Sequence, residues 1–194
     1  MLNKQSDQLG VTLIELIVGV MIVGILIAVA APNLSMWVQN SQIRTTAQAI
    51  QNGLQLARGE AVSRNTQVRF QLTSTTDNAC VLSTTSSNWV VSLDDPTGAC
   101  AATPSDTVAP RIIQVRSSAE GSGNAVIGTT GMSTFTFNGL GRLTNTAGTI
   151  SVTNPGGGAC APTGTMNCLN VIVTLGGQIR MCNPAKSSSD PQGC

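Results

Sequence analysis

The sequence predicts an α+β fold in which one long N-terminal helix carries a mostly antiparallel β-domain of two sheets. Two observations predict it. Apolar residues run almost unbroken from residue 11 to residue 31 and then recur at helical spacing as far as residue 61. After residue 67, short β-branched runs alternate with turns rich in Gly, Asn and Pro. We expect four parts: a polar N-terminal segment at 1–10, an apolar helix at 11–32, its amphipathic continuation at 33–66, and a β-domain at 67–194.

The apolar segment 11–31 is interrupted only by Thr12, Glu15 and glycines. As a helix it would be about 31 Å long, enough to cross the hydrocarbon layer of a bilayer. A secretory signal peptide is the alternative, because AVA at 28–30 offers small residues at the spacing of a cleavage site. Glu15 inside the segment, and helical periodicity that continues beyond it, favour the spanning helix.

The second half of the helix carries one apolar stripe at steps of three and four, which is typical of a helix with one buried face. The stripe consists of Ile43, Ala47, Ile50, Leu54, Ala57 and Ala61. Pro32 removes a backbone hydrogen bond between the two halves, so we expect a kink or local melting there. Trp37 is placed to anchor the helix at a membrane interface.

The β-domain is expected to hold short strands, because β-branched or alternating runs are separated by turn signals. In STFTFN at 133–138, Phe135 and Phe137 share one face, which should be buried. Trp89 is expected in the core. The predicted strands are 67–73, 79–83, 88–93, 111–116, 125–128, 133–138, 149–153, 169–175 and 178–182.

Six cysteines favour disulfide bonds over a metal site, because the chain has no C-x-x-C pair and no histidine. Disulfides persist outside the cytosol. The connectivity stays open on sequence grounds, and nearest-neighbour pairing is our hypothesis because each pair brackets a turn-rich stretch. It joins Cys80 with Cys100, Cys160 with Cys168, and Cys182 with Cys194.

Composition excludes several functions. Ten Lys and Arg against nine Asp and Glu leave no strong general field to attract nucleic acid. No histidine is present and no Ser or Thr has a recognisable base beside it, so we expect no catalytic residue, no metal and no cofactor. The adjacent acids Asp94 and Asp95 precede a proline and are interpreted as turn residues rather than calcium ligands.

The stretch GVTLIEL at 10–16 resembles the signature of type IV prepilins and type II secretion pseudopilins, in which a leader ends in Gly and Glu is fifth in the mature chain. Val11 stands where Phe is usual. The resemblance implies that a prepilin peptidase cuts between Gly10 and Val11 and methylates the new amino group of Val11. It also implies a single-pass protein of the bacterial inner membrane, with its β-domain in the periplasm, that later enters a pilus or pseudopilus.

Glu15 needs a partner, because a charge in a membrane helix costs a few kcal/mol. Stacked subunits can place the Glu15 carboxylate of one beside the Val11 amine of its neighbour, so that each charge neutralises the other. A carboxylate that reaches back to the membrane interface is the alternative. We assign Val11, Glu15 and Pro32 to assembly.

Two further stretches, LARGEAVSRNTQV at 56–68 and VTLGGQIRMCNP at 173–184, resemble the GspH/FimT family of minor pilins and pseudopilins. The resemblance implies a minor pilin of the FimU-like branch that works with other pilins or pseudopilins, the prepilin peptidase, and an assembly platform in the inner membrane. The alternatives are a type II secretion pseudopilin and a DNA-binding minor pilin for natural transformation.

Some members of this family bind DNA through a motif that resembles G-R-x-R. The matching residues here are Gly177, Gln178, Ile179 and Arg180, so glutamine replaces the first arginine. Fewer cationic contacts mean weaker phosphate binding. Arg180, Lys186 and Arg142 are the possible DNA contacts that remain.

Overall fold

The computed structural model describes residues 11–120 and 123–194, with the backbone alone for residues 29–33. The leader expected at 1–10, including Gly10, lies outside the described residues. The chain divides into two compact units that meet between Trp37 and Val38. The elements are α1 (Leu13–Arg64), β1 (Val68–Thr73), β2 (Asn88–Ser92), β3 (Ile112–Arg116), β4 (Val126–Thr129), β5 (Thr134–Phe137), β6 (Gly148–Thr153), the 3-10 helix η1 (Pro155–Gly157), β7 (Leu169–Val173) and β8 (Ile179–Cys182).

α1 is helical without a break through Pro32, so of the kink or local melting predicted there, the local melting is not found. A proline removes one backbone donor, and the bonds of the turns on both sides keep the helix continuous. α1 ends at Arg64, where Asn65 takes a left-handed φ of 48°. Asn tolerates this conformation, which commonly ends helices. Thr66 N then donates to Ala61 O at 3.2 Å.

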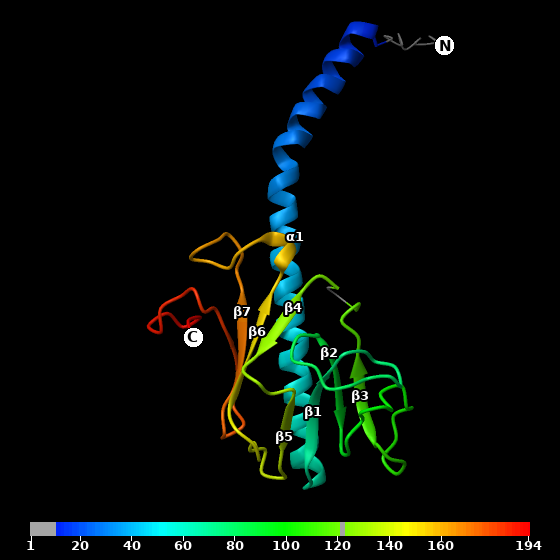
Figure 1. Ribbon diagram of the computed structural model, residues 1–194. Coiled ribbons are helices and arrows are strands. Elements are labelled where there is room, and N and C mark those ends of the chain that lie inside the picture. The colour runs from blue at the N-terminus through cyan, green and yellow to red at the C-terminus, as the bar shows by residue number, and fades with distance from the viewer. Residues whose placement is uncertain (1–10, 121–122) are drawn as a thin grey trace, which may run out of the picture. The chain divides into compact units, whose positions relative to one another are not determined.

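The strands form two antiparallel sheets, in the orders β3-β2-β1-β5 and β4-β6-β7-β8. In Figure 1 the strands of both sheets lie alongside the second half of α1. The two-sheet α+β fold was therefore predicted correctly. Most strand boundaries differ from the prediction by one or two residues.

The strand predicted at 79–83 was wrong. Only Leu82 pairs there, in an isolated bridge with Thr73. Asp77 Oδ1 accepts a hydrogen bond from Ala79 N at 2.8 Å, and Cys80 is bonded to Cys100. The short apolar run that predicted a strand, which contains Val81 and Leu82, therefore follows a side-chain-capped turn that a disulfide joins to the next loop.

The core lies between α1 and both sheets. Every residue of the predicted helical stripe, from Ile43 to Ala61, is 0% exposed. Phe70 of β1 packs against Trp89, with ring centroids 5.5 Å apart. Gly53 makes this possible, because a Cβ at that position would lie 2.7 Å from the Phe70 ring. Burial of each large side chain contributes about 1.5–3 kcal/mol.

Three amide side chains near the start of the second unit hold α1 to loops more than a hundred residues away. Gln39 Nε2 donates to Gly156 O at 3.0 Å, and Asn40 Oδ1 accepts from Asn167 N at 2.8 Å. Gln42 Oε1 accepts from Asn154 Nδ2 at 2.7 Å. Asn154 is only 2% exposed and also caps η1, so this bond fixes the η1 turn on α1.

Candidate assembly and interaction sites

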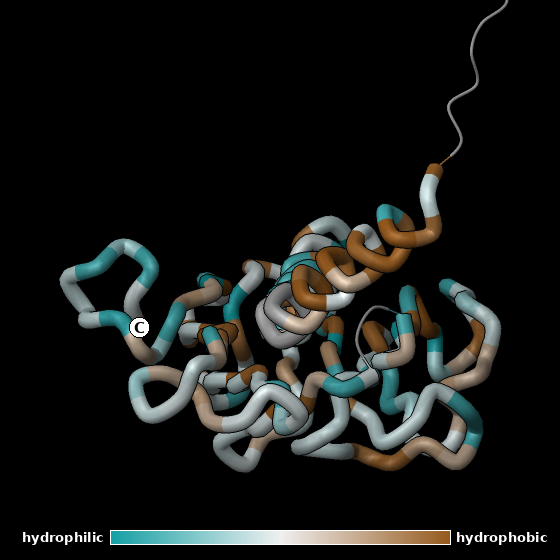
Figure 2. The backbone as a smooth tube through the Cα atoms, turned by 90° about the horizontal axis from the view of Figure 1, so that it is seen from above, coloured by the Kyte–Doolittle hydropathy of each residue, from teal (hydrophilic) through white to brown (hydrophobic). Residues whose placement is uncertain are grey.

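The first part of α1 presents an apolar surface on all sides. Every large apolar side chain from Val11 to Ile27 is exposed, between 42% for Ile17 and 79% for Leu13. Figure 2 shows this part of the helix as a largely hydrophobic tube. Contiguous exposed apolar surface of this kind marks an interaction site.

Among the residues that the structure describes, no helix has the length and apolar character needed to cross a membrane.

Glu15 is the acidic residue in the first turn of α1. Thr12 precedes the helix, and its Oγ1 accepts from Glu15 N at 3.4 Å. Thr-x-x-Glu is the pattern of a capping box, in which the glutamate also suits the positive end of the helix dipole. Sequence reasoning missed this local role, although the TLIE spacing could have revealed it. Glu15 thus has a structural use in one subunit besides any role between subunits.

The two C-terminal candidates for DNA contact are engaged within the chain. Arg180 on β8 donates through its two terminal nitrogens to the oxygens of Gly193 and Cys194, at 3.2 and 3.1 Å. Lys186 Nζ donates to Gln192 Oε1 at 2.8 Å and lies 3.3 Å from Asp190 Oδ2. Both cations therefore brace the C-terminal loop that the Cys182–Cys194 bond closes.

Arg142, the third candidate, is exposed. Its neighbour Gly141 belongs to a turn that contacts both α1 and the turn that contains Gly177. Arg58 Nε donates to Gly141 O at 3.2 Å. Gly177 packs against the same oxygen, where any side chain would collide, and its φ is 78°. The glycine of the DNA-motif stretch is therefore required by packing and by backbone conformation. Sequence reasoning did not foresee that Arg58 and Gly177 would meet at one carbonyl.

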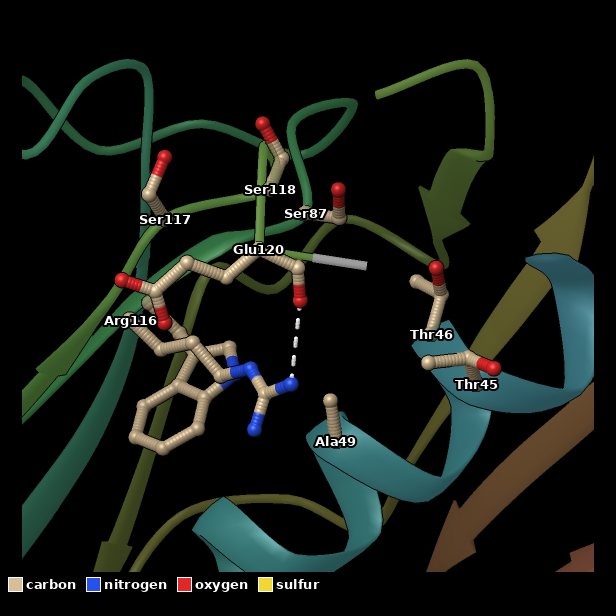
Figure 3. A pocket seen from close by; sticks show the side chains of 9 residues that line it. Thr45, Thr46, Ala49, Ser87, Arg116, Ser117, Ser118 and Glu120 are labelled. Carbon is tan, nitrogen blue, oxygen red and sulfur yellow. Dashed lines mark hydrogen bonds between the residues drawn. The ribbon is translucent and has the colours of Figure 1, made fainter. Parts of the chain in front are cut away.

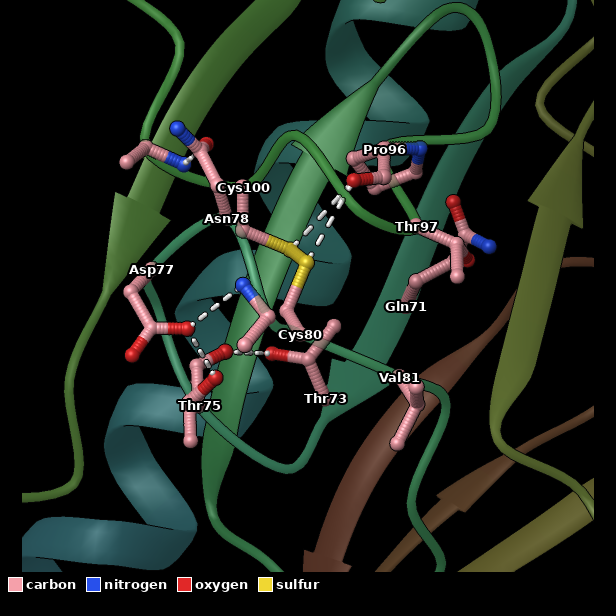
Figure 4. The surroundings of a disulfide bond; sticks show 12 residues. Gln71, Thr73, Thr75, Asp77, Asn78, Cys80, Val81, Pro96, Thr97 and Cys100 are labelled. Carbon is pink, nitrogen blue, oxygen red and sulfur yellow. Dashed lines mark hydrogen bonds between the residues drawn. A yellow bond between two sulfur atoms is a disulfide. The ribbon is translucent and has the colours of Figure 1, made fainter.

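The three disulfides follow nearest-neighbour pairing: Cys80–Cys100, Cys160–Cys168 and Cys182–Cys194. Figure 4 shows the first, whose sulfur atoms lie 3.4 and 3.5 Å from Pro96 O. A disulfide sulfur carries no hydrogen, so these are packing contacts. Both cysteines are 1% exposed and form a small second core with Val90 and Ile112.

Asp95 caps the turn that it precedes, whereas Asp94 forms an ion pair with Arg111 of a later loop. Arg111 donates to both Asp94 oxygens, at 2.7 and 2.6 Å, and this pairing lowers the pKa of Asp94. Asp95 Oδ1 accepts from Thr97 Oγ1 at 2.7 Å and Thr97 N at 3.1 Å, which lowers the pKa of Asp95. In the part of the chain that the structure describes, no three His, Cys, Asp or Glu residues gather as a metal site would require.

A small pocket lies between α1 and the ends of β2 and β3 (Figure 3). Trp89 and Ser87 line it from β2 and its lead-in, and Arg116 donates across it to Glu120 O at 3.1 Å. Its cavity of about 10 Å³ is the size of one water molecule. The pocket is too small to serve as a ligand site.

Comparison with known proteins finds two family matches and a similar fold. Residues 46–177 match the family described as Type II transport protein GspH, and residues 5–31 match the prokaryotic N-terminal methylation motif. A crystal structure of the type IV minor pilin FimU from Pseudomonas aeruginosa (strain PAO1) is similar, with 16% identity, a TM-score of 0.51, and coverage of 76% of this chain and 93% of that chain. A second crystal form of FimU gives 14% identity, a TM-score of 0.48, and coverage of 76% and 98%. No curated protein sequence matches the chain.

The long helix, the two sheets and the methylation motif define a type IV pilin or pseudopilin. Because the GspH match covers more than half of its length, the chain belongs to the GspH/FimT family. The resemblance seen at both ends of the sequence is thereby confirmed.

Proposed function

We propose that this protein is a minor pilin of a type IV pilus system. A prepilin peptidase cleaves it between Gly10 and Val11 and methylates Val11, and residues 11–32 then hold it in the bacterial inner membrane. The β-domain folds in the periplasm, where the three disulfides can persist. From there an assembly platform moves the subunit into the filament.

The exposed apolar half of α1, with Glu15 in its first turn, carries this proposal. Exposure of such a surface to water is unfavourable, and packing among the helices of other pilins would cover it. In that apolar setting the Glu15 carboxylate of one subunit pairs with the Val11 amine of the next. The protein acts through subunit contacts and not as an enzyme.

The Glu15 pairing is tested by two substitutions that separate charge from helix capping. Gln can replace Glu in a capping box but carries no charge, whereas Ala neither caps the helix nor carries a charge. If charge pairing drives assembly, Glu15→Gln and Glu15→Ala both enter filaments poorly, while cleavage after Gly10 continues. Loss of one partner of a buried pair typically costs about 3–5 kcal/mol.

Glu60→Gln is the matched control, because Glu60 lies on the same helix in an ion pair with Arg64. It should enter filaments as wild type does. Incorporation of Glu15→Gln at the wild-type level, with Glu15→Ala alone impaired, would show that Glu15 serves only the helix end.

The choice of a pilus over a type II secretion pseudopilus is supported by the likeness in fold to a type IV minor pilin. The family description names type II transport, so the secretion role is the alternative within the same architecture. DNA binding has less support, because Arg180 and Lys186 already donate to groups in the C-terminal loop.

A further inference from the structure

Three segments meet near the C-terminal end of α1 and hold one another in place. They are the last turns of α1, the turn at 138–143 and the turn at 174–178. Leu143 N of the first turn donates to Leu175 O of the second turn at 3.1 Å. Arg58 of α1 donates to Gly141 O of the first turn. A Cβ on Gly141 would lie 3.0 Å from Val62, so the first turn also packs on the helix.

This interlocked structure presents apolar side chains to solvent. Leu140 is 78% exposed, Leu175 is 54% exposed and Val62 is 51% exposed. Each comes from a different segment, and the two leucines occupy turns, where polar residues are the norm. A single exposed leucine needs no explanation, but a cluster on a preorganised surface indicates an interaction site. We name Arg58, Val62, Leu140, Arg142 and Leu175 the α1-end patch.

The charges of the α1-end patch have one sign. Among the described residues neither Arg58 nor Arg142 forms a salt bridge, and the patch contains no acidic side chain. Arg58 uses Nε on a carbonyl oxygen, and Arg142 is exposed. The surface therefore combines exposed apolar groups with two cations that lack a carboxylate partner in this part of the chain.

We propose that the α1-end patch docks a neighbouring pilin subunit through an apolar surface that carries a carboxylate. The inference rests on the proposed function and adds to it a second contact, made by the globular unit independently of the N-terminal helix. Charge complementarity selects the carboxylate, and the exposed leucines select a protein partner. Nucleic acid fits less well, because the patch offers two cations and no aromatic side chain for stacking.

The first test is photocrosslinking of the full chain in its native cell. A photoreactive phenylalanine analogue replaces Leu140 in one strain and Val108 in a control strain, since Val108 is 68% exposed and lies outside the patch. We expect an adduct from position 140 in sheared filaments, joined to a pilin peptide that contains Asp or Glu. An adduct with DNA, or equal adducts from both positions, would overturn the proposal.

The second test uses charge and apolarity. Arg142→Glu, and Leu140→Ser with Leu175→Ser, should each lower the number of copies per filament on the order of tenfold. Val108→Ser should have no effect. Intact disulfides and wild-type protease resistance in each variant guard against misfolding. Restoration of Arg142→Glu by a carboxylate-to-Arg change at the crosslinked partner position would confirm the pairing.

Failure of the two proposals can be told apart. If the wild-type protein enters filaments and the patch variants enter equally well, the docking inference is wrong and the minor pilin function stands. If the wild-type protein itself is absent from filaments, the proposed function fails and the docking inference fails with it.

Discussion

Two glycines on α1 give opposite predictions for the same substitution. Gly53 faces the core, where a Cβ would lie 2.7 Å from the Phe70 ring and 3.0 Å from Trp89. Gly59 is exposed, and a Cβ there would meet nothing within 4 Å. Replacing Gly by Ala in a helix gains up to about 1 kcal/mol, from lower backbone entropy in the unfolded chain.

Gly59→Ala should therefore raise the free energy of unfolding by about 1 kcal/mol. Gly53→Ala has the same gain but forces two buried rings apart, and overpacking of a core costs about 1–3 kcal/mol. We expect Gly53→Ala to be less stable than Gly59→Ala by about 1–3 kcal/mol, and no more stable than wild type. A difference of this size shifts the melting temperature by at least about 2–4 °C.

Equilibrium unfolding in urea, with disulfides intact and with Trp fluorescence as the signal, measures both variants. Trp89 is 2% exposed and packs on Phe70, so its emission reports the affected region. If Gly53→Ala stabilises the protein as much as Gly59→Ala does, the close packing of α1 on β1 and β2 is wrong.

Three further predictions concern the globular unit. Gln42→Ala should destabilise the fold by about 1–3 kcal/mol in urea unfolding, because it leaves the buried Asn154 amide without its partner, whereas the exposed Gln48→Ala should have little effect. The lowered pKa of Asp94 stabilises the fold above the unfolded carboxyl pKa of about 3.9, and this stability is lost as pH falls through the folded pKa. The melting temperature should therefore fall below about pH 4, and fall less in Asp94→Asn. Under mild reductant, mass spectrometry with thiol labelling should find Cys182–Cys194 opened first, since Cys194 is exposed, and Cys80–Cys100 opened last, since both cysteines are 1% exposed.

The helix and the sheets could be predicted because their signals are local and periodic. The stripe from Ile43 to Ala61 is visible in the sequence as a helical repeat, and Phe135 and Phe137 alternate as a half-buried strand requires. The segment 79–83 has strand composition but is governed by a turn and a disulfide. Amino-acid composition does not show whether a segment pairs as a strand or instead follows a turn that a disulfide holds.

The candidate sites were predicted only in part, because they depend on contacts between distant segments. Nothing in the sequence joins Arg58 to Gly141, or Gln42 to Asn154, since these pairs form only when the sheets close on α1. The same holds for Arg180, which looked free for DNA and is held by the chain's last residues. Thr12 is different, because its role at the start of α1 could have been found from spacing alone.

The central claim is that this chain is a processed subunit of a pilus, and one measurement tests it most directly. Filaments sheared from the native cell are digested and analysed by mass spectrometry for an N-terminal peptide that begins at Val11. We expect this peptide, methylated at its amino group, in trace amount relative to the main subunit. Absence of the peptide from filaments, while the mature protein remains in the inner membrane, would contradict the pilus assignment and favour a secretion pseudopilin.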